Sequence, residues 1–229
     1  MVVQGFSRGW SLYQRHLDRP ESETFSLLGR EWDLLDGVFA PTLTPVTEIF
    51  TNWLPFPSGG SFLDVGCGAG VTAVSAALAG CASVLALDIS AAAVANTQRN
   101  VARHGVTDVV EVLRSDLFDG VPAGRSFDLI FWNSSFAEPP EGFVNGTELH
   151  HAFFDPDYRT HERFLREAPR WLAAHGRLLL GFSDIGNWER LTALAENLGL
   201  QFRLVRQQDG RPAVPLVFQL LEISGWNGS

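Results

Sequence analysis

Apolar and polar residues alternate regularly from residue 61 to the end of the chain. Nearly continuous apolar runs predict buried strands at residues 61–65, 83–87, 109–113, 127–132 and 176–182. Between the first two runs, Val71, Val74 and Leu78 follow helical spacing. Strands that alternate with helices predict a parallel sheet with helices on both faces.

Residues that favour helix ends mark two of the intervening helices. Ser90 is a typical N-cap, and the helix it begins should run to about residue 104. Asp155 before Pro156 predicts the cap and first turn of a helix that reaches about residue 175. Pro169 should kink or shorten that helix, because it lacks the backbone N–H of an interior position.

The last part of the chain predicts a helix followed by a hairpin. The helix spans residues 187–198 and is closed by Gly199. Segments 201–207 and 216–223 flank the turn Asp209-Gly210-Arg211-Pro212. The expected fold class is therefore α/β, with a seven-stranded, mostly parallel sheet and an antiparallel C-terminal hairpin.

Residues 1–58 have a different pattern, rich in Pro and Trp. We expect them to be mostly helical, with one helix at residues 45–53. Pro and Gly residues at 55–60 read as a linker. The predicted organisation is a helical N-terminal extension or lid at 1–58 and an α/β domain at 59–229.

Composition narrows the possible chemistry. The chain has 17 basic and 26 acidic residues, and its formal net charge is −9. Because an acidic chain is not attracted to phosphates or anionic lipid, we expect no nucleic-acid partner and no membrane partner. All the basic residues are Arg, which excludes a Schiff-base lysine and a P-loop lysine. The oligomeric state is left open.

The cysteines and the N-terminus favour a cytoplasmic location. A short helix between Cys67 and Cys81 would separate them by about 15 Å, too far for a disulfide. Both are therefore expected to be reduced. The N-terminus lacks the pattern of a signal peptide. The uncharged stretch 65–87 holds four glycines and is interpreted as loop, helix and strand rather than as a membrane span.

A glycine-rich motif follows the first predicted strand, and it reads Asp64-Val65-Gly66-Cys67-Gly68-Ala69-Gly70. Glycines let the backbone turn tightly and approach a ligand at the N-terminus of the next helix. Asp88 ends the second predicted strand, where an acidic residue can accept both hydroxyls of a ribose. A carboxylate at Asp64 would repel a pyrophosphate but suits an ammonium group.

This combination resembles the first motif of class I S-adenosylmethionine-dependent methyltransferases, which share a Rossmann-like fold. The resemblance covers the chain from about residue 61 onward, including the motifs Ser115-Asp116-Leu117-Phe118 and Phe127-Asp128-Leu129-Ile130-Phe131-Trp132-Asn133. It implies that S-adenosyl-L-methionine is the cofactor. It also implies a set of cofactor-binding residues, which are Asp64, Gly66, Gly68, Gly70, Asp88, Ile89, Asp116, Leu117 and Asn133.

The resemblance also assigns roles to these residues. Asp64 and the glycine loop would hold the methionyl part, and Asp88 the ribose hydroxyls. Ile89 would pack on adenine. Asp116 would accept from the exocyclic amine, and the Leu117 N–H would reach a ring nitrogen. No metal is expected.

A polar loop follows the fourth predicted strand and reads Asn133-Ser134-Ser135-Phe136. It is similar to the Asn-Pro-Pro-Tyr or Asn-Pro-Pro-Phe signature of methyltransferases that act on planar nitrogens, with both prolines replaced by serine. The resemblance implies that Asn133 anchors the attacking nitrogen and Phe136 stacks on the acceptor. Tyr158, in the segment before the next helix, could offer its ring to a cation or simply pack in the core. The expected catalytic residues are Asn133, Phe136 and Tyr158.

Three functions remain open at this point. The favoured one is direct, in-line methyl transfer to a small molecule, at nitrogen, which needs positioning more than a strong base. A cyclase of the same fold would convert the cofactor to azetidine-2-carboxylate and methylthioadenosine. A non-catalytic S-adenosylmethionine-binding module is the third. Whether His150, His151, Asp155 and His161 contact substrate is also open.

Overall fold

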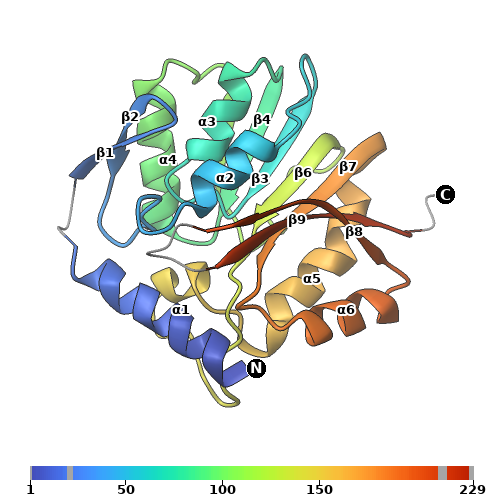
Figure 1. The fold of residues 1–229 in the computed structure, drawn as a ribbon. Coiled ribbons are helices and arrows are strands. Elements are labelled where there is room, and N and C mark those ends of the chain that lie inside the picture. Colours follow the sequence, from blue (N-terminus) through green and yellow to red (C-terminus); the bar gives the residue numbers. More distant parts are fainter. Residues whose placement is uncertain (1, 20–22, 211–215, 227–229) are drawn as a thin grey trace.

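A computed structural model describes residues 2–19, 23–210 and 216–226. Its main feature is a seven-stranded sheet in the order β5-β4-β3-β6-β7-β9-β8 (Figure 1). In this sheet β9 is antiparallel to both of its neighbours, β7 and β8, and the other pairs are parallel, so the predicted fold class is confirmed. The strands are β3 Ser61–Val65, β4 Ser83–Asp88, β5 Val110–Arg114, β6 Phe127–Asn133, β7 Leu172–Ser183, β8 Gln201–Asp209 and β9 Val217–Ser224.

Alternation along the central strands builds a core on each face of the sheet. Phe62 and Val84 pack on the face covered by α2 (Val46–Trp53), α3 (Val71–Leu78) and α4 (Ala91–Arg103). Their neighbours Leu63 and Leu85 pack on the opposite face, under α5 (Arg159–Glu167) and α6 (Trp188–Asn197). Because both faces are buried, these strands are apolar throughout, which is why they stand out in the sequence.

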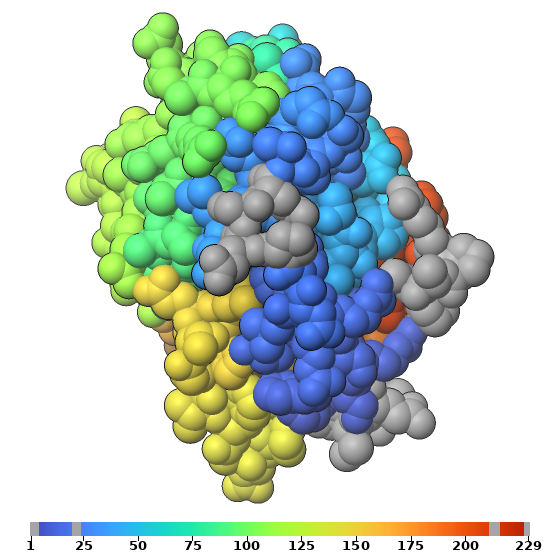
Figure 2. All heavy atoms as spheres, turned by 90° about the vertical axis from the view of Figure 1, so that its left-hand side faces the viewer, coloured from blue at the N-terminus to red at the C-terminus, as the bar shows by residue number. Residues whose placement is uncertain are grey.

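The N-terminal region is only partly helical, so one expectation is wrong. Helix α1 spans Val2–Leu17, but β1 (Glu23–Leu27) and β2 (Arg30–Leu34) form an antiparallel hairpin. Leu28 and Gly29 form its turn with φ of 53° and 70°. Figure 2 shows this blue region running beside the green part of the chain in the upper half of the view and beside the yellow part in the lower half. Trp32 and Leu34 join the same core as Phe62.

The predicted helix at 155–175 is broken into shorter pieces. Short 3₁₀ helices cover Glu148–Ala152, Pro156–Tyr158 and Ala168–Trp171, and α5 lies between the last two. Pro169 lies in the last piece and shortens the helix, as its ring requires. Strand β7 then starts at Leu172, earlier than predicted.

The C-terminal hairpin has the predicted strands β8 and β9, while residues 211 and 212 of the predicted turn lie outside the described residues. Strand β8 is an edge of the sheet and is largely exposed on both sides. Its register shifts between Leu204 and Arg206. Among the described helices, none has both the length and the apolar character needed to cross a bilayer.

Candidate functional site

A cavity of about 390 Å³ opens where β3, β4 and β6 end. The chain runs outward from β3 to β5 and then returns to place β6 on the other side of β3. The carboxyl ends of the strands at such a switch point form the usual ligand crevice of an open α/β sheet. Additional walls come from α1, the segment 37–47 and the segment 148–153.

The glycine-rich loop lines the cavity directly after β3. Gly66, Gly68 and Gly70 have φ of 69°, 55° and 81°, a region that side chains rarely adopt. A Cβ at Gly70 would lie 2.8 Å from the Thr97 side chain, so glycine is also required by space. Gly66 and Gly68 therefore present bare backbone to the cavity, beside the small side chains of Cys67 and Ala69.

Asp88 at the end of β4 fixes this loop. Its Oδ2 accepts from the Gly68 N–H at 2.9 Å, and its Oδ1 accepts from the Ser90 N–H at 2.9 Å. Burial raises the pKa of this carboxyl, and the two backbone donors offset part of that effect. Each oxygen still has acceptor capacity for a ligand hydroxyl. Ile89 follows on the cavity wall.

Asp64 faces the cavity from β3 and is 2% exposed. Its Oδ2 has no hydrogen-bond partner among the described residues. Burial, and to a lesser extent the charge of Asp88, raise the pKa of this carboxyl to about 8. A buried acceptor of this kind suits a cationic ligand group, because such a group satisfies its desolvated charge.

Asp116 and Leu117 line the cavity after β5. Asp116 is half exposed and accepts from Arg163 at 2.8 Å. Leu117 has a φ of 49°, and its carbonyl accepts from the Ser115 hydroxyl at 2.8 Å. The structure therefore places eight of the nine predicted cofactor residues on the wall of one cavity, while Gly70 packs against Thr97 behind the loop.

The loop after β6 supplies the opposite wall through Asn133, Ser134, Ser135 and Phe136. Asn133 Oδ1 is buried and has no partner within the described chain. The Ser134 hydroxyl donates to the Gly181 carbonyl at 2.8 Å, which joins the loop to β7. Phe136 meets Phe182 edge to face at 6.2 Å between ring centroids.

Tyr158, one of the expected catalytic residues, lies away from the cavity and packs in the core, the second of the two alternatives for its ring. Its side chain is fully buried and is not part of the cavity wall. The ring stacks on His161 at 4.4 Å, and Asp155 Oδ2 contacts Nδ1 of that histidine at 2.6 Å. Of the four residues whose contacts were left open, only His151 lines the cavity.

Helix α4 contributes residues that sequence reasoning missed. The Thr97 hydroxyl donates to the Gly68 carbonyl at 2.9 Å, and Asn100 Nδ2 donates to the Ala69 carbonyl at 2.8 Å. Asn96, Thr97 and Asn100 are fully buried, although this helix face should be apolar. Buried amides at i and i+4 on such a face are the signal that could have revealed them.

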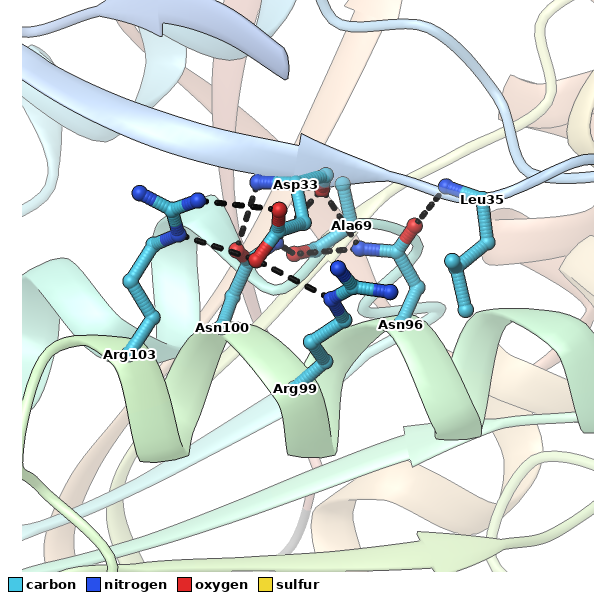
Figure 3. A network of polar contacts seen from close by, with 7 residues as sticks. All are labelled: Asp33, Leu35, Ala69, Asn96, Arg99, Asn100 and Arg103. Atoms are coloured by element: carbon cyan, nitrogen blue, oxygen red, sulfur yellow. Dashed lines mark hydrogen bonds and ion pairs between the residues drawn. The ribbon is translucent and has the colours of Figure 1, made fainter. Parts of the chain in front are cut away.

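The same asparagines hold the N-terminal hairpin, as Figure 3 shows. The Asp33 carbonyl accepts from both Asn96 and Asn100, and its N–H donates to Asn100 Oδ1 at 2.8 Å. The Asp33 carboxylate pairs with Arg103 and with Arg99. One helix face therefore ties the hairpin to the glycine loop.

Cys67 and Cys81 are free and buried, as predicted. Cys67 lies in the glycine loop, and its sulfur lies 3.3 Å from the Thr97 hydroxyl oxygen. Burial raises the pKa of this thiol well above its usual value. It therefore packs as a neutral small residue in the loop.

Solved structures with a similar fold include two methyltransferases. The 16S rRNA N2 G1207 methyltransferase of T. Thermophilus, in complex with AdoMet and guanosine, has a TM-score of 0.60 and 21% identity, over 88% of this chain and 49% of that chain. The ribosomal protein L11 methylase of Lactobacillus delbrueckii subsp. bulgaricus has a TM-score of 0.55 and 17% identity, over 80% of each chain. At these identities the likeness concerns the fold.

Sequence relatives are similar over parts of their length. Ribosomal RNA small subunit methyltransferase C of Chromohalobacter salexigens is 36% identical over 133 residues, 58% of this chain and 34% of that protein. Ribosomal protein L11 methyltransferase of Desulforamulus reducens is 48% identical over 81 residues, 35% of this chain and 26% of that protein. The chain thus spans about a quarter to a third of these two relatives.

These relatives overturn the prediction of a small-molecule substrate with no nucleic-acid partner. Their names refer to a ribosomal protein and to ribosomal RNA, both macromolecules. The exclusion of a nucleic-acid partner rested on the net charge of −9. Net charge averages over the whole surface and carries no information about the rim of one cavity.

The family comparison covers most of the chain. Residues 33–209 match the methyltransferase small domain family, from the second strand of the hairpin to the end of β8. This range includes the glycine loop, Asp88 and the loop after β6. The chain therefore belongs to the methyltransferase small domain family, and its resemblance to class I S-adenosylmethionine-dependent methyltransferases is confirmed.

Proposed function

We propose that this protein is an S-adenosylmethionine-dependent methyltransferase that transfers the methyl group to a nitrogen atom of a macromolecule, with a protein amide as the favoured acceptor. The observation that carries the proposal is Asn133 Oδ1, a buried acceptor without a protein partner on the cavity wall. An attacking N–H₂ group would satisfy this oxygen. A buried acceptor left unpaired costs about 1–3 kcal/mol, so a ligand donor is expected there.

The residues opposite Asn133 fit the cofactor. Asp64 Oδ2 also lies on the cavity wall and has no hydrogen-bond partner within the described part of the chain, and it suits the ammonium of a methionyl group. Asp88 and the glycine loop present two carboxylate oxygens and bare backbone on the same wall. S-adenosylmethionine, when bound, supplies a methyl group on a sulfonium.

The protein's own contribution is then positional. Asn133 would orient the attacking nitrogen, and Phe136 would stack on its planar group. Orientation and exclusion of water account for most of the rate in such a displacement, so no strong base is required on the cavity wall.

The charge near the cavity favours a protein over RNA. The two arginines that the described residues place on the cavity wall are already paired, Arg159 with Asp157 at 2.9 Å and Arg163 with Asp116 at 2.8 Å. Phosphate binding relies on cations that are free to pair with it. A second candidate, methylation of ribosomal RNA, is favoured by the relative from Chromohalobacter salexigens.

Product analysis with different acceptors tests the proposal. The purified protein and S-adenosylmethionine are incubated with ribosomal protein L11, with 16S rRNA or with no acceptor. We expect S-adenosylhomocysteine and a methylated amide only with protein. Methylated RNA would select the second candidate, and methylthioadenosine without acceptor would indicate the cyclase.

The variant Asn133→Ala tests the proposed role of Asn133 Oδ1 as the acceptor for the attacking nitrogen. Misorientation of the nucleophile by about 1 Å can cost on the order of 100-fold in turnover. We expect turnover to fall by about this factor, while calorimetry gives nearly unchanged S-adenosylhomocysteine affinity. Wild-type turnover by the variant would remove Asn133 from the proposed mechanism. If the wild-type protein binds S-adenosylmethionine but forms no product with any acceptor, the result favours a non-catalytic S-adenosylmethionine-binding module over an enzyme.

A further inference from the structure

The loop after β6 must hold its shape without the prolines found in similar loops. Ser134 and Ser135 occupy these positions, and serine leaves φ free where proline fixes it. Ordering a free residue costs about 1–2 kcal/mol of backbone entropy. The loop nevertheless holds Asn133 Oδ1 buried and unpartnered, which requires fixed geometry.

Tyr158 supplies a contact that fixes this loop from behind. Its hydroxyl donates to the Phe136 carbonyl at 2.7 Å and accepts from the Asn187 N–H at 2.7 Å. One hydroxyl thus joins the loop after β6 to Asn187, the N-cap of α6. Burial raises the pKa of the Tyr158 phenol above its ordinary value. The hydroxyl therefore keeps its proton and remains a hydrogen-bond donor.

The backbone around Tyr158 is itself held in an unusual conformation. Asp157 and Tyr158 have φ of 56° and 51°, which costs non-glycine residues about 1–3 kcal/mol each. Asp155 stabilises this kink, because its carboxylate accepts from the N–H groups of Thr160 and His161 at 3.0 and 2.9 Å. The side chain of Tyr158 is thereby aimed at the loop.

The next residue of the loop is held by the same segment. The Asp155 N–H donates to the Ala137 carbonyl at 3.1 Å, and Ala137 forms a bridge with Phe154. Two consecutive carbonyls, those of Phe136 and Ala137, therefore accept hydrogen bonds from the segment 155–158.

We propose that Tyr158 is a positioning residue, whose hydroxyl holds the loop 133–136 in the geometry for methyl transfer and takes over the role of the missing prolines. This inference rests on the proposed function, because it assigns Tyr158 a part in that reaction. Tyr158 acts through the Phe136 backbone and touches neither the cofactor nor the acceptor.

The variant Tyr158→Phe tests this role, with Tyr13→Phe as matched control. These two are the only tyrosines of the chain, and both are buried. Tyr158→Phe should lower kcat by about tenfold or more through misorientation, with the KM for cofactor and acceptor nearly unchanged. Tyr13→Phe should retain wild-type kcat. A wild-type kcat in Tyr158→Phe would overturn the proposal.

A double-mutant cycle separates positioning from general stability. If the Tyr158 hydroxyl and the prolines both fix the geometry of the loop, the hydroxyl matters less once the prolines are present. In a protein that carries Ser134→Pro and Ser135→Pro, adding Tyr158→Phe should therefore lower kcat by less than about threefold. An equal loss on both backgrounds contradicts the shared role. If Tyr158→Phe alone fails to fold, the effect of removing the hydroxyl is measured in the protein that carries the two prolines.

Hydrogen exchange gives a readout that needs no acceptor. Amides in the segment 133–140 should exchange faster in Tyr158→Phe than in Tyr13→Phe. Equal exchange would contradict the inference even if the wild-type enzyme is active. If the wild-type protein shows no turnover, the proposed function fails on its own, and exchange still decides whether Tyr158 holds the loop.

Discussion

Asp64 and Asp88 place two carboxyl groups in one buried wall, and the protein holds the first of them protonated around neutral pH. The folded-state pKa of Asp64, about 8, lies above its unfolded value of 3.8. The folded state therefore binds this proton more tightly, and stability falls as pH rises from about 4 to about 8. The ionised form of the Asp64 carboxyl is stabilised only when a cationic ligand group binds beside it.

The variant Asp64→Asn tests this loss of stability at higher pH, because its amide does not ionise. It removes the buried carboxylate at nearly constant shape, so its melting temperature should exceed that of the wild type by a few degrees at pH 8, with the difference vanishing near pH 4. Thermal unfolding at several pH values measures this. Wild-type affinity for S-adenosylhomocysteine should rise between pH 6 and 8, whereas the variant should show weak, flat affinity. A pH-independent difference in melting temperature would contradict the assignment.

Asp88→Asn tests the second carboxyl. The amide keeps one acceptor oxygen but loses the charge and places an NH₂ group against a backbone donor of the loop. Hydrogen bonds to charged groups contribute about 1.5–3 kcal/mol, so S-adenosylhomocysteine should bind about 10- to 150-fold more weakly. Calorimetric titration measures the loss. The exposed Asp119→Asn is the control, and equal affinities in both variants would exclude Asp88 from the site.

Among the elements, α4 supports both the N-terminal hairpin and the glycine loop from one face. Asn100 Nδ2 donates to the Asp33 carbonyl and to the Ala69 carbonyl. Asn100→Ala leaves these buried groups unpaired and should destabilise the protein by about 1–3 kcal/mol. It should also weaken S-adenosylhomocysteine binding, because the glycine loop loses a support. Chemical denaturation and calorimetry check the two effects.

Arg103→Ala is the matched control for Asn100→Ala. Arg103 pairs with Asp33 from the partly exposed side and does not touch the loop. Asp33 keeps its ion pair with Arg99 in this variant, so Arg103→Ala should lose less stability than Asn100→Ala and no affinity. If Arg103→Ala weakens binding as much as Asn100→Ala, the hairpin rather than the asparagine supports the loop.

The elements also show how far sequence reasoning reaches. Strands β3, β4 and β6 were predictable because burial on both faces makes them apolar throughout. The hairpin β1–β2 was missed because its turn uses Leu28 and Gly29, both at positive φ, where Asn-Gly or Asp-Gly would be the recognisable signal.

The grouping of Asp64, the glycine loop and Asp88 at one cavity was predictable for a related reason, since they lie at strand ends whose order follows from the chain. The contacts of Tyr158 and Asn100 were not predictable. They join residues 22 to 67 positions apart, and their partners are backbone groups, which carry no sequence signal.

At the scale of the whole molecule, the N-terminal region and the sheet share one core. Phe25 and Trp32 belong to the same buried cluster as Phe62 and Leu179. The full chain should therefore unfold in one cooperative calorimetric transition. A chain that starts at residue 59 should lack such a transition, because the cluster loses its cover. Two resolved transitions in the full chain would indicate separable units.

The position of β9 between β7 and β8 has a consequence for how the protein is made. β9 comes last in the chain, yet it pairs with the strand whose end is buried most completely. A nascent chain that has emerged only through β8 exposes β7 as an apolar, unpaired edge, the form most prone to aggregate. The polar edge of β8 protects the sheet only after β9 has joined it, so delays in translating β9 leave the chain at its most vulnerable.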